Sequence, residues 1–207
     1  MYVKVCGLDS VANARVAVEA GAHAIGVVMS PASPRHLDFA TARQVVDAVR
    51  DDVDTVLVVR EMDAVAAADM AGRLGVRVLQ LHGGRYGRDE FARALERFPR
   101  VWRATALADD TDLAVGAWGE ERLLLDAPRA GSGERWDLAA LDRRRPTGEW
   151  LLAGGLDPAN VAGAIATARP WGVAVSSGVE SSPGVKDPDL VRAFVAAASG
   201  ADDAQAG

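Results

Sequence analysis

The stretch Trp150-Leu151-Leu152-Ala153-Gly154-Gly155-Leu156-Asp157-Pro158 holds, in that order, an apolar run, a glycine pair and an Asp-Pro step. A short continuous apolar run favours a strand that is buried on both faces, as in a parallel sheet. An Asp followed by Pro is typical of a helix start, with the Asp as N-cap and the Pro in the first turn. The segment therefore predicts one β/α unit, with its helix over residues 158–168.

Seven further apolar runs of this kind occur in the 207 residues, at 2–6, 24–29, 55–59, 76–81, 101–104, 122–126 and 173–176. Apolar residues at helical spacing separate them, over 11–20, 40–49, 64–74, 90–98 and 188–197, and in shorter form over 109–118 and 136–141. Eight β/α units predict an α/β fold, a single (β/α)8 TIM barrel over residues 1–198, whereas a doubly wound sheet usually has fewer strands. Residues 199–207 lack apolar periodicity, and we expect them to form a disordered tail.

Composition narrows the class of protein. The chain is 49% apolar and carries a net charge of −6, so no overall field attracts nucleic acid. The single cysteine, Cys6, excludes an internal disulfide, and His23, His36 and His82 lie too far apart to predict a metal site. No apolar run reaches the length of a membrane span and no leader precedes the first strand, so we expect a cytoplasmic protein with neither a nucleic-acid nor a membrane partner.

The chemistry of a TIM barrel lies at the carboxyl ends of its strands. Cys6 ends the first run and shares its parity with Lys4, so both side chains should point into the barrel, where a thiolate could act as a base. Asp126 ends the sixth run, and burial would raise its pKa, which suits a general acid. The alternatives are a buried structural cysteine and a carboxylate that caps a loop or pairs with an arginine.

Glycine-rich segments follow the last three runs. They contain Gly131 and Gly133, then Gly154 and Gly155, then Ser177 and Gly178. Glycine lets backbone N–H groups approach an anion closely, so three such segments on neighbouring strands predict a phosphate site, although turns also use glycine.

Three basic residues are further candidates. Arg35, just past the second run, has a fork that could bind a carboxylate, or it is a solvated loop residue. His82 fits a structural role. Lys4 could form a Schiff base, although an inward lysine in a barrel more often pairs with a carboxylate.

The same segments resemble the phosphoribosylanthranilate isomerase family of tryptophan biosynthesis, from residue 2 to about residue 195. The matching stretches are Val3-Lys4-Val5-Cys6-Gly7-Leu8, Gly21-Ala22-His23-Ala24-Ile25-Gly26 with Ser33-Pro34-Arg35, Gln80-Leu81-His82-Gly83, Leu124-Leu125-Asp126 with Gly131-Ser132-Gly133 and Trp136-Asp137, Leu152–Val161, and Ser176-Ser177-Gly178-Val179-Glu180-Ser181-Ser182-Pro183-Gly184-Val185-Lys186-Asp187. The last two are the longest and the most specific.

The resemblance implies an Amadori rearrangement of N-(5-phosphoribosyl)anthranilate to 1-(2-carboxyphenylamino)-1-deoxyribulose 5-phosphate. Asp126 would protonate the ribose ring oxygen, and Cys6 would remove the C2 proton. Arg35 would bind the anthranilate carboxylate, and the glycine segments would hold the phosphate. The partner would be this phosphorylated aminosugar, with no metal or organic cofactor, and the protein would be a monomer or a homodimer.

Two departures concern the anthranilate end of the substrate. Ala174 stands where the family usually has an acidic residue, and Val58-Val59-Arg60-Glu61 replaces a stretch that contains Phe and Asn. A paralogue that acts on a related N-ribosyl phosphate therefore stays open.

Other functions fit the sequence less well. The histidine-pathway aminosugar isomerase uses a carboxylate at the position of Cys6 and has a two-fold repeat that this chain lacks. Indole-glycerol-phosphate synthase needs inward lysines on more than one strand, and only Lys4 is available. A non-catalytic barrel that binds a sugar phosphate would have no need of Cys6 and Asp126.

Overall fold

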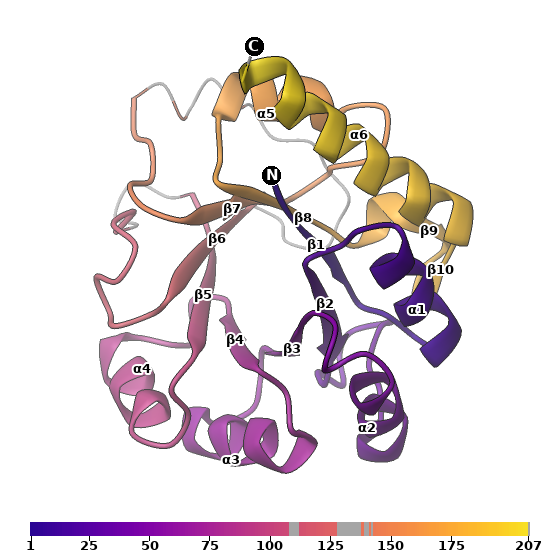
Figure 1. The fold of residues 1–207 in the computed structure, drawn as a ribbon. Coiled ribbons are helices and arrows are strands. Elements are labelled where there is room, and N and C mark those ends of the chain that lie inside the picture. Colours follow the sequence, from indigo (N-terminus) through magenta and orange to yellow (C-terminus); the bar gives the residue numbers. More distant parts are fainter. Residues whose placement is uncertain (108–111, 128–137, 139–140, 142, 207) are drawn as a thin grey trace.

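The computed structural model describes residues 1–107, 112–127, 138, 141 and 143–206, with only the backbone for 202–206. Eight parallel strands form a closed barrel in chain order (Figure 1). They are β1 (Tyr2–Cys6), β2 (Ala24–Val28), β3 (Asp54–Val59), β4 (Val78–His82), β5 (Val101–Ala106), β6 (Arg122–Asp126), β7 (Trp150–Leu152) and β8 (Gly172–Val175). The predicted TIM barrel is confirmed, and every strand overlaps its predicted run.

In the part of the chain that the structure describes, six α-helices lie outside the barrel (Figure 1). They are α1 (Val11–Glu19), α2 (Phe39–Asp47), α3 (Ala64–Leu74), α4 (Arg88–Leu95), α5 (Val161–Ala168) and α6 (Pro188–Ala206). Between β8 and α6 the chain forms a short 3-10 helix, η2 (Ser177–Val179), and a hairpin of β9 (Glu180–Ser182) and β10 (Val185–Lys186).

Local side-chain bonds set several helix starts. The side chains of Ser10, Asp38 and Asp63 each accept a backbone N–H from the first turn of α1, α2 and α3, respectively. At α6, Asp187 accepts from the N–H groups of Asp189 and Leu190, as the Asp-Pro signal predicted. Such caps satisfy donors that have no partner within the helix.

The strands divide the apolar residues into two cores. Alternate residues face either the surrounding helices or the barrel interior, because successive strand side chains point to opposite faces. Val3, Val5 and Leu57 belong to the core between barrel and helices, whereas Val58 and Trp102 belong to the interior. The interior core is the layer on which any site at the barrel mouth rests.

Parallel pairing of β1 with β8 closes the barrel. Tyr2 lies opposite Gly172 and Lys4 lies opposite Ala174, while the other edge of β1 pairs with β2. The first and last strands of the barrel are therefore neighbours, and residues from both reach the same point of the interior.

The start of α5 differs from the prediction. The helix begins at Val161, not at residue 158, and Asn160 is its N-cap residue. The Asp157 side chain accepts from the N–H groups of Ala159 and Asn160 and so closes a separate turn. Asn160 Nδ2 in turn donates to Gly155 O at 2.8 Å, which ties this turn to the glycine pair after β7.

The helix predicted over residues 109–118 is absent from its described part, 112–118. Arg103, on the outer face of β5, donates through Nε to Glu120 Oε1 at 2.7 Å and through Nη2 to Asp112 O at 2.8 Å. Glu120 Oε2 accepts the Trp118 N–H at 2.8 Å. These buried side chains satisfy backbone groups that a helix would otherwise pair, so the segment is held as a loop. The helix predicted over 136–141 lies outside the described residues except at 138 and 141.

The C-terminal helix extends beyond residue 198, where we expected the barrel domain to end. α6 continues to Ala206, and Ala201 packs against the core on its outer side. The backbone of residues 199–206 is therefore helical, whereas we expected a disordered tail from residue 199. Residue 207 lies outside the described residues.

Candidate active site

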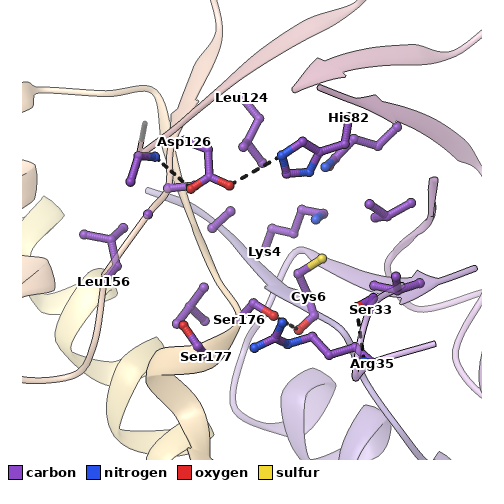
Figure 2. Close-up of a pocket in the computed structure, with 18 of the residues that line it drawn as sticks. Lys4, Cys6, Ser33, Arg35, His82, Leu124, Asp126, Leu156, Ser176 and Ser177 are labelled. Carbon is purple, nitrogen blue, oxygen red and sulfur yellow. Dashed lines mark hydrogen bonds and ion pairs between the residues drawn. The ribbon is translucent and has the colours of Figure 1, made fainter. Parts of the chain in front are cut away.

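A pocket opens at the carboxyl ends of the barrel strands (Figure 2). Six of the predicted site residues line it: Cys6, Arg35, Asp126, Gly154, Gly155 and Ser177. Gly178 lies next to it in η2. Gly131 and Gly133 lie outside the described residues. The pocket thus brings together residues that are far apart in the chain. From the sequence alone, each of them could be assigned only to the end of a strand.

Asp126 reaches the pocket from the end of β6 and is 7% exposed. Burial raises its pKa, while the Ala127 N–H bond and the charges of Arg60 and Lys4 act in the opposite direction. The Ala127 N–H donates to Oδ1 at 2.8 Å and leaves Oδ2 facing His82 (Figure 2). A carboxyl whose protonated form is favoured in this way is suited to donate a proton.

His82 is a neutral neighbour of that carboxyl. Its Nε2 lies 3.6 Å from Asp126 Oδ2. Burial, followed by the charges of Arg60 and Lys4, lowers the pKa of His82 to about 3. The ring is therefore uncharged near neutral pH, and its contact with Asp126 is not an ion pair.

Cys6 and Lys4 lie close together on the inner face of β1, as their shared parity predicted. A Cβ at Gly26 on β2 would lie 2.8 Å from Cys6 Sγ and 3.3 Å from Lys4 Nζ. Figure 2 shows Lys4 in the pocket between the side chains of Cys6 and Asp126. The thiol and the amine therefore lie side by side at the base of the pocket.

Lys4 does not have the carboxylate partner expected of an inward lysine. Its Nζ is fully buried and forms no hydrogen bond with any described residue. The residue opposite it on β8 is Ala174, at the position where an acid was expected. Gln80 Oε1, also buried and in the pocket lining, likewise has no partner in the described part of the chain.

The loops after β7 and β8 present backbone donors to the pocket. Within the described residues, the N–H groups of Gly154, Gly155 and Ser177 donate to no protein oxygen. The two loops touch, since a Cβ at Gly178 would lie 1.9 Å from Leu156 O. Unpaired N–H groups gathered in this way form the kind of site that binds a phosphate group.

Arg35 lines the pocket but is already bound. Its Nε and Nη2 donate to the two carboxylate oxygens of Glu180, at 2.6 and 2.8 Å. Lys186 Nζ donates to the same carboxylate at 2.5 Å. Burial alone would raise the pKa of Glu180, but the bonds from Arg35 and Lys186 hold it below its ordinary value. The sequence had placed Arg35 correctly but gave no sign of this pairing.

The site also contains a residue to which sequence reasoning gave no role, Arg60. It directly follows β3 and lines the pocket. Inward parity from Val56 and Val58 was the signal that could have found it.

The described residues show no sign of two other features, a metal centre and a membrane span. They contain no group of three or more His, Cys, Asp or Glu side chains placed to hold a metal ion. No described helix is long and apolar enough to cross a membrane.

Comparisons with known proteins find similarity over almost the whole chain. A family model described as N-(5'phosphoribosyl)anthranilate (PRA) isomerase matches residues 3–197. The N-(5'-phosphoribosyl)anthranilate isomerase of Paracoccus denitrificans is 40% identical over 208 residues, which cover 95% of this chain and 96% of that protein.

Solved structures show the same similarity. The crystal structure of TrpF from Jonesia denitrificans is 56% identical, covers 98% of both chains and superposes with a TM-score of 0.90. A phosphoribosyl anthranilate isomerase in complex with reduced 1-(o-carboxyphenylamino)-1-deoxyribulose 5-phosphate is 31% identical, with a TM-score of 0.84 over 97% of this chain and 99% of that one.

Proposed function

Since the chain belongs to the N-(5'-phosphoribosyl)anthranilate isomerase family, we propose that it converts N-(5'-phosphoribosyl)anthranilate to 1-(2-carboxyphenylamino)-1-deoxyribulose 5-phosphate with Asp126 as acid and Cys6 as base. The observation that carries these roles is the entry of both side chains into one pocket, from β6 and β1 (Figure 2). An aldose-to-ketose shift needs one acid and one base at the reacting carbons.

The reaction begins at the buried carboxyl. Protonated Asp126 donates to the ribose ring oxygen, the C1–O bond breaks, and the nitrogen lone pair forms the C1=N bond of a Schiff base. The Cys6 thiolate then takes the C2 proton, and the electrons of that C–H bond give an enolamine. Tautomerisation moves a proton to C1 and leaves the ketone at C2.

Binding energy from the phosphate would position the sugar for both transfers. The N–H groups of Gly154, Gly155 and Ser177, which have no acceptor among the described residues, support a phosphate site at the loops after β7 and β8. A group held there is remote from C1 and C2, so its binding energy can orient the reacting atoms. Gly178 would contribute by letting the two loops touch.

The test follows the loss of substrate fluorescence with freshly generated phosphoribosylanthranilate. We expect wild type to convert it, and Cys6→Ala and Asp126→Asn each to reduce kcat by about a hundred- to ten-thousand-fold, the usual contribution of a general acid or base. Both variants should still bind the reduced product analogue. A folded wild-type protein that binds but never turns over would instead support a non-catalytic barrel.

We further propose that the protein works in the cytoplasm, as a monomer or a homodimer. A biosynthetic isomerase that acts on a phosphorylated intermediate would meet its substrate there. Sedimentation of the purified chain at micromolar concentration would decide between the two assemblies.

A further inference from the structure

The buried ammonium of Lys4 has no task in the chemistry proposed above. Its side chain extends from the inner face of β1 and lines the pocket. It is fully buried, and Nζ has no hydrogen-bond partner among the described residues. A buried charge without a partner is costly, and the cost points to a ligand that supplies the missing acceptor.

The strands beside Lys4 explain why the protein itself offers no acceptor at this point. The residue opposite Lys4 on β8 is Ala174, and the residue opposite it on β2 is Ala24. Both belong to the apolar core of the barrel interior. The side chain passes these neighbours and extends toward the carboxyl ends of the strands, because a Cβ at Gly26 would lie 3.3 Å from Nζ.

Nζ therefore reaches the level of the base. Gly26 lies opposite Cys6 on β2, and the same Cβ would lie 2.8 Å from Cys6 Sγ. In Figure 2 the Lys4 side chain lies between those of Cys6 and Asp126. With Cys6 as base and Asp126 as acid, an atom bound to Nζ is next to the carbons that react.

Among the acceptors of the substrate, the oxygen on C2 fits this place. In the function proposed above, the phosphate lies at the loops after β7 and β8. The resemblance implies Arg35, in the loop after β2, as the ligand of the ring carboxylate. The C2 oxygen belongs to the carbon that Cys6 deprotonates. It is a hydroxyl in the substrate and a ketone oxygen in the product, so it can accept a hydrogen bond at every stage.

We propose that Lys4 Nζ donates a hydrogen bond to the C2 oxygen and is a further catalytic residue of this pocket. The inference rests on the proposed function. The ammonium keeps its proton throughout. Its charge draws electron density from C2 while Cys6 removes the C2 proton, and it stabilises the negative charge that develops on the oxygen as the ketone forms. A donor that is fixed in place before the reaction, in a site closed to water, is effective in this way.

Lys4→Met separates this catalytic role from a structural one. Methionine is of similar length and uncharged, so the melting temperature should hold or rise as the unpaired buried charge is removed. We expect kcat to fall by about a hundred- to a thousand-fold, the usual effect of losing one donor at a developing charge. Thr55→Val, a buried polar-to-apolar change outside the pocket lining, should leave kcat unchanged. An unchanged kcat in Lys4→Met would overturn the inference.

Calorimetry with two stable ligands locates the contact. One ligand is the reduced product analogue, which has a hydroxyl on C2, and the other is the same compound without that hydroxyl. Wild type should bind the first about ten- to a hundred-fold more tightly, the range of a hydrogen bond to a charged group. Lys4→Met should bind the two ligands almost equally. If Lys4→Met keeps the wild-type preference, Nζ does not bind this oxygen.

The pH profile distinguishes a bond to the substrate from an effect on Cys6 alone. The ratio of wild-type to Lys4→Met kcat should stay constant as the pH rises through about 8.5, the ordinary pKa of a thiol. A ratio that falls to one would mean that Lys4 only favours the thiolate, and the inference would be wrong.

A second variant, Lys4→Ala, leaves space for an added amine. Propylammonium should restore part of its kcat and uncharged propanol should not, whereas equal rescue by both would contradict a role for the charge. Failure of the proposed function would appear separately, as wild-type protein that does not turn over phosphoribosylanthranilate.

Discussion

The buried pair of Arg103 and Glu120 offers a sharp test of how the loop between β5 and β6 is held. The two side chains are 2% and 0% exposed, and their atoms approach to 2.7 Å. Glu120→Ala leaves Arg103 buried without its carboxylate and also removes the acceptor of the Trp118 N–H. Breaking such a pair costs about 3–5 kcal/mol.

At about 2–4 °C per kcal/mol for a chain of this length, the melting temperature should fall by roughly 6–20 °C. Urea unfolding, followed by circular dichroism, measures the free energy directly. Turnover at 25 °C should persist, because the pair lies on the outer face of β5 and not in the pocket.

Asp69→Ala is a control at an exposed ion pair. Asp69 pairs with Arg97, but their side chains are 54% and 55% exposed, so its loss should cost under about 1 kcal/mol. A double change of Arg103→Met and Glu120→Leu should recover part of the loss, since no buried charge remains, although the Trp118 N–H still lacks its acceptor. If Glu120→Ala costs no more than Asp69→Ala, the reasoning about this loop is refuted.

Other predictions concern the pocket itself. Burial raises the pKa of Asp126 in the folded chain, so folding stability is lost as pH rises through that pKa, and kcat/KM falls as the acid form disappears. Asp126→Asn should therefore raise the melting temperature at pH 8 but not below about pH 4. An equal effect at both pH values would contradict the raised pKa of Asp126. Gly178→Ala should raise KM more than it lowers kcat by pushing the phosphate loops apart, whereas Gly163→Ala, whose Cβ meets open space, should not. Ala174→Asp should give the buried Lys4 Nζ an acceptor and stabilise the fold by up to about 1–3 kcal/mol in urea unfolding, the cost of an unsatisfied buried donor, with a smaller gain from the uncharged Ala174→Asn.

The strands were predictable because strong local patterns coincide with what the barrel requires. A parallel strand is buried on both faces, so its sequence is continuously apolar and easy to recognise. Cys6, Asp126 and the glycine segments could be placed for the same reason, since they follow directly from strand ends. The convergence of Cys6, Asp126 and the segments after β7 and β8 in one pocket needed only the rule that parallel strand ends share one face of a barrel.

Some side chains bond to backbone groups where a helix was expected, and these bonds could not be predicted from the sequence. Asp157 reads as an N-cap, yet it closes a turn of its own, because Asn160 ties that turn to Gly155. Glu120 reads as a surface acid but is buried under a loop by Arg103. Each outcome depends on a partner distant in sequence or on a competing local bond, neither of which periodicity records.

The ion pair between Arg35 and Glu180 could not be predicted from the sequence for the same reason. Arg35 and Glu180 are 145 residues apart, so no local pattern joins them. The guanidinium fork of Arg35 and its place after the second strand suggested a carboxylate ligand, and the structure shows a carboxylate of the protein itself, Glu180, bound to it.

The pairing of β1 with β8 has a consequence for how the chain folds during synthesis. Tyr2, on the first strand of the barrel, is made long before its partner Gly172, which belongs to the last strand. Until then one edge of β1 stays unpaired, with its N–H and C=O groups free to join another strand, as in aggregation. Contacts between such distant residues also slow folding, because a long loop must be closed before they form. A ribosome that stalls before residue 172 would therefore carry an open sheet, and premature termination there should yield an aggregation-prone product.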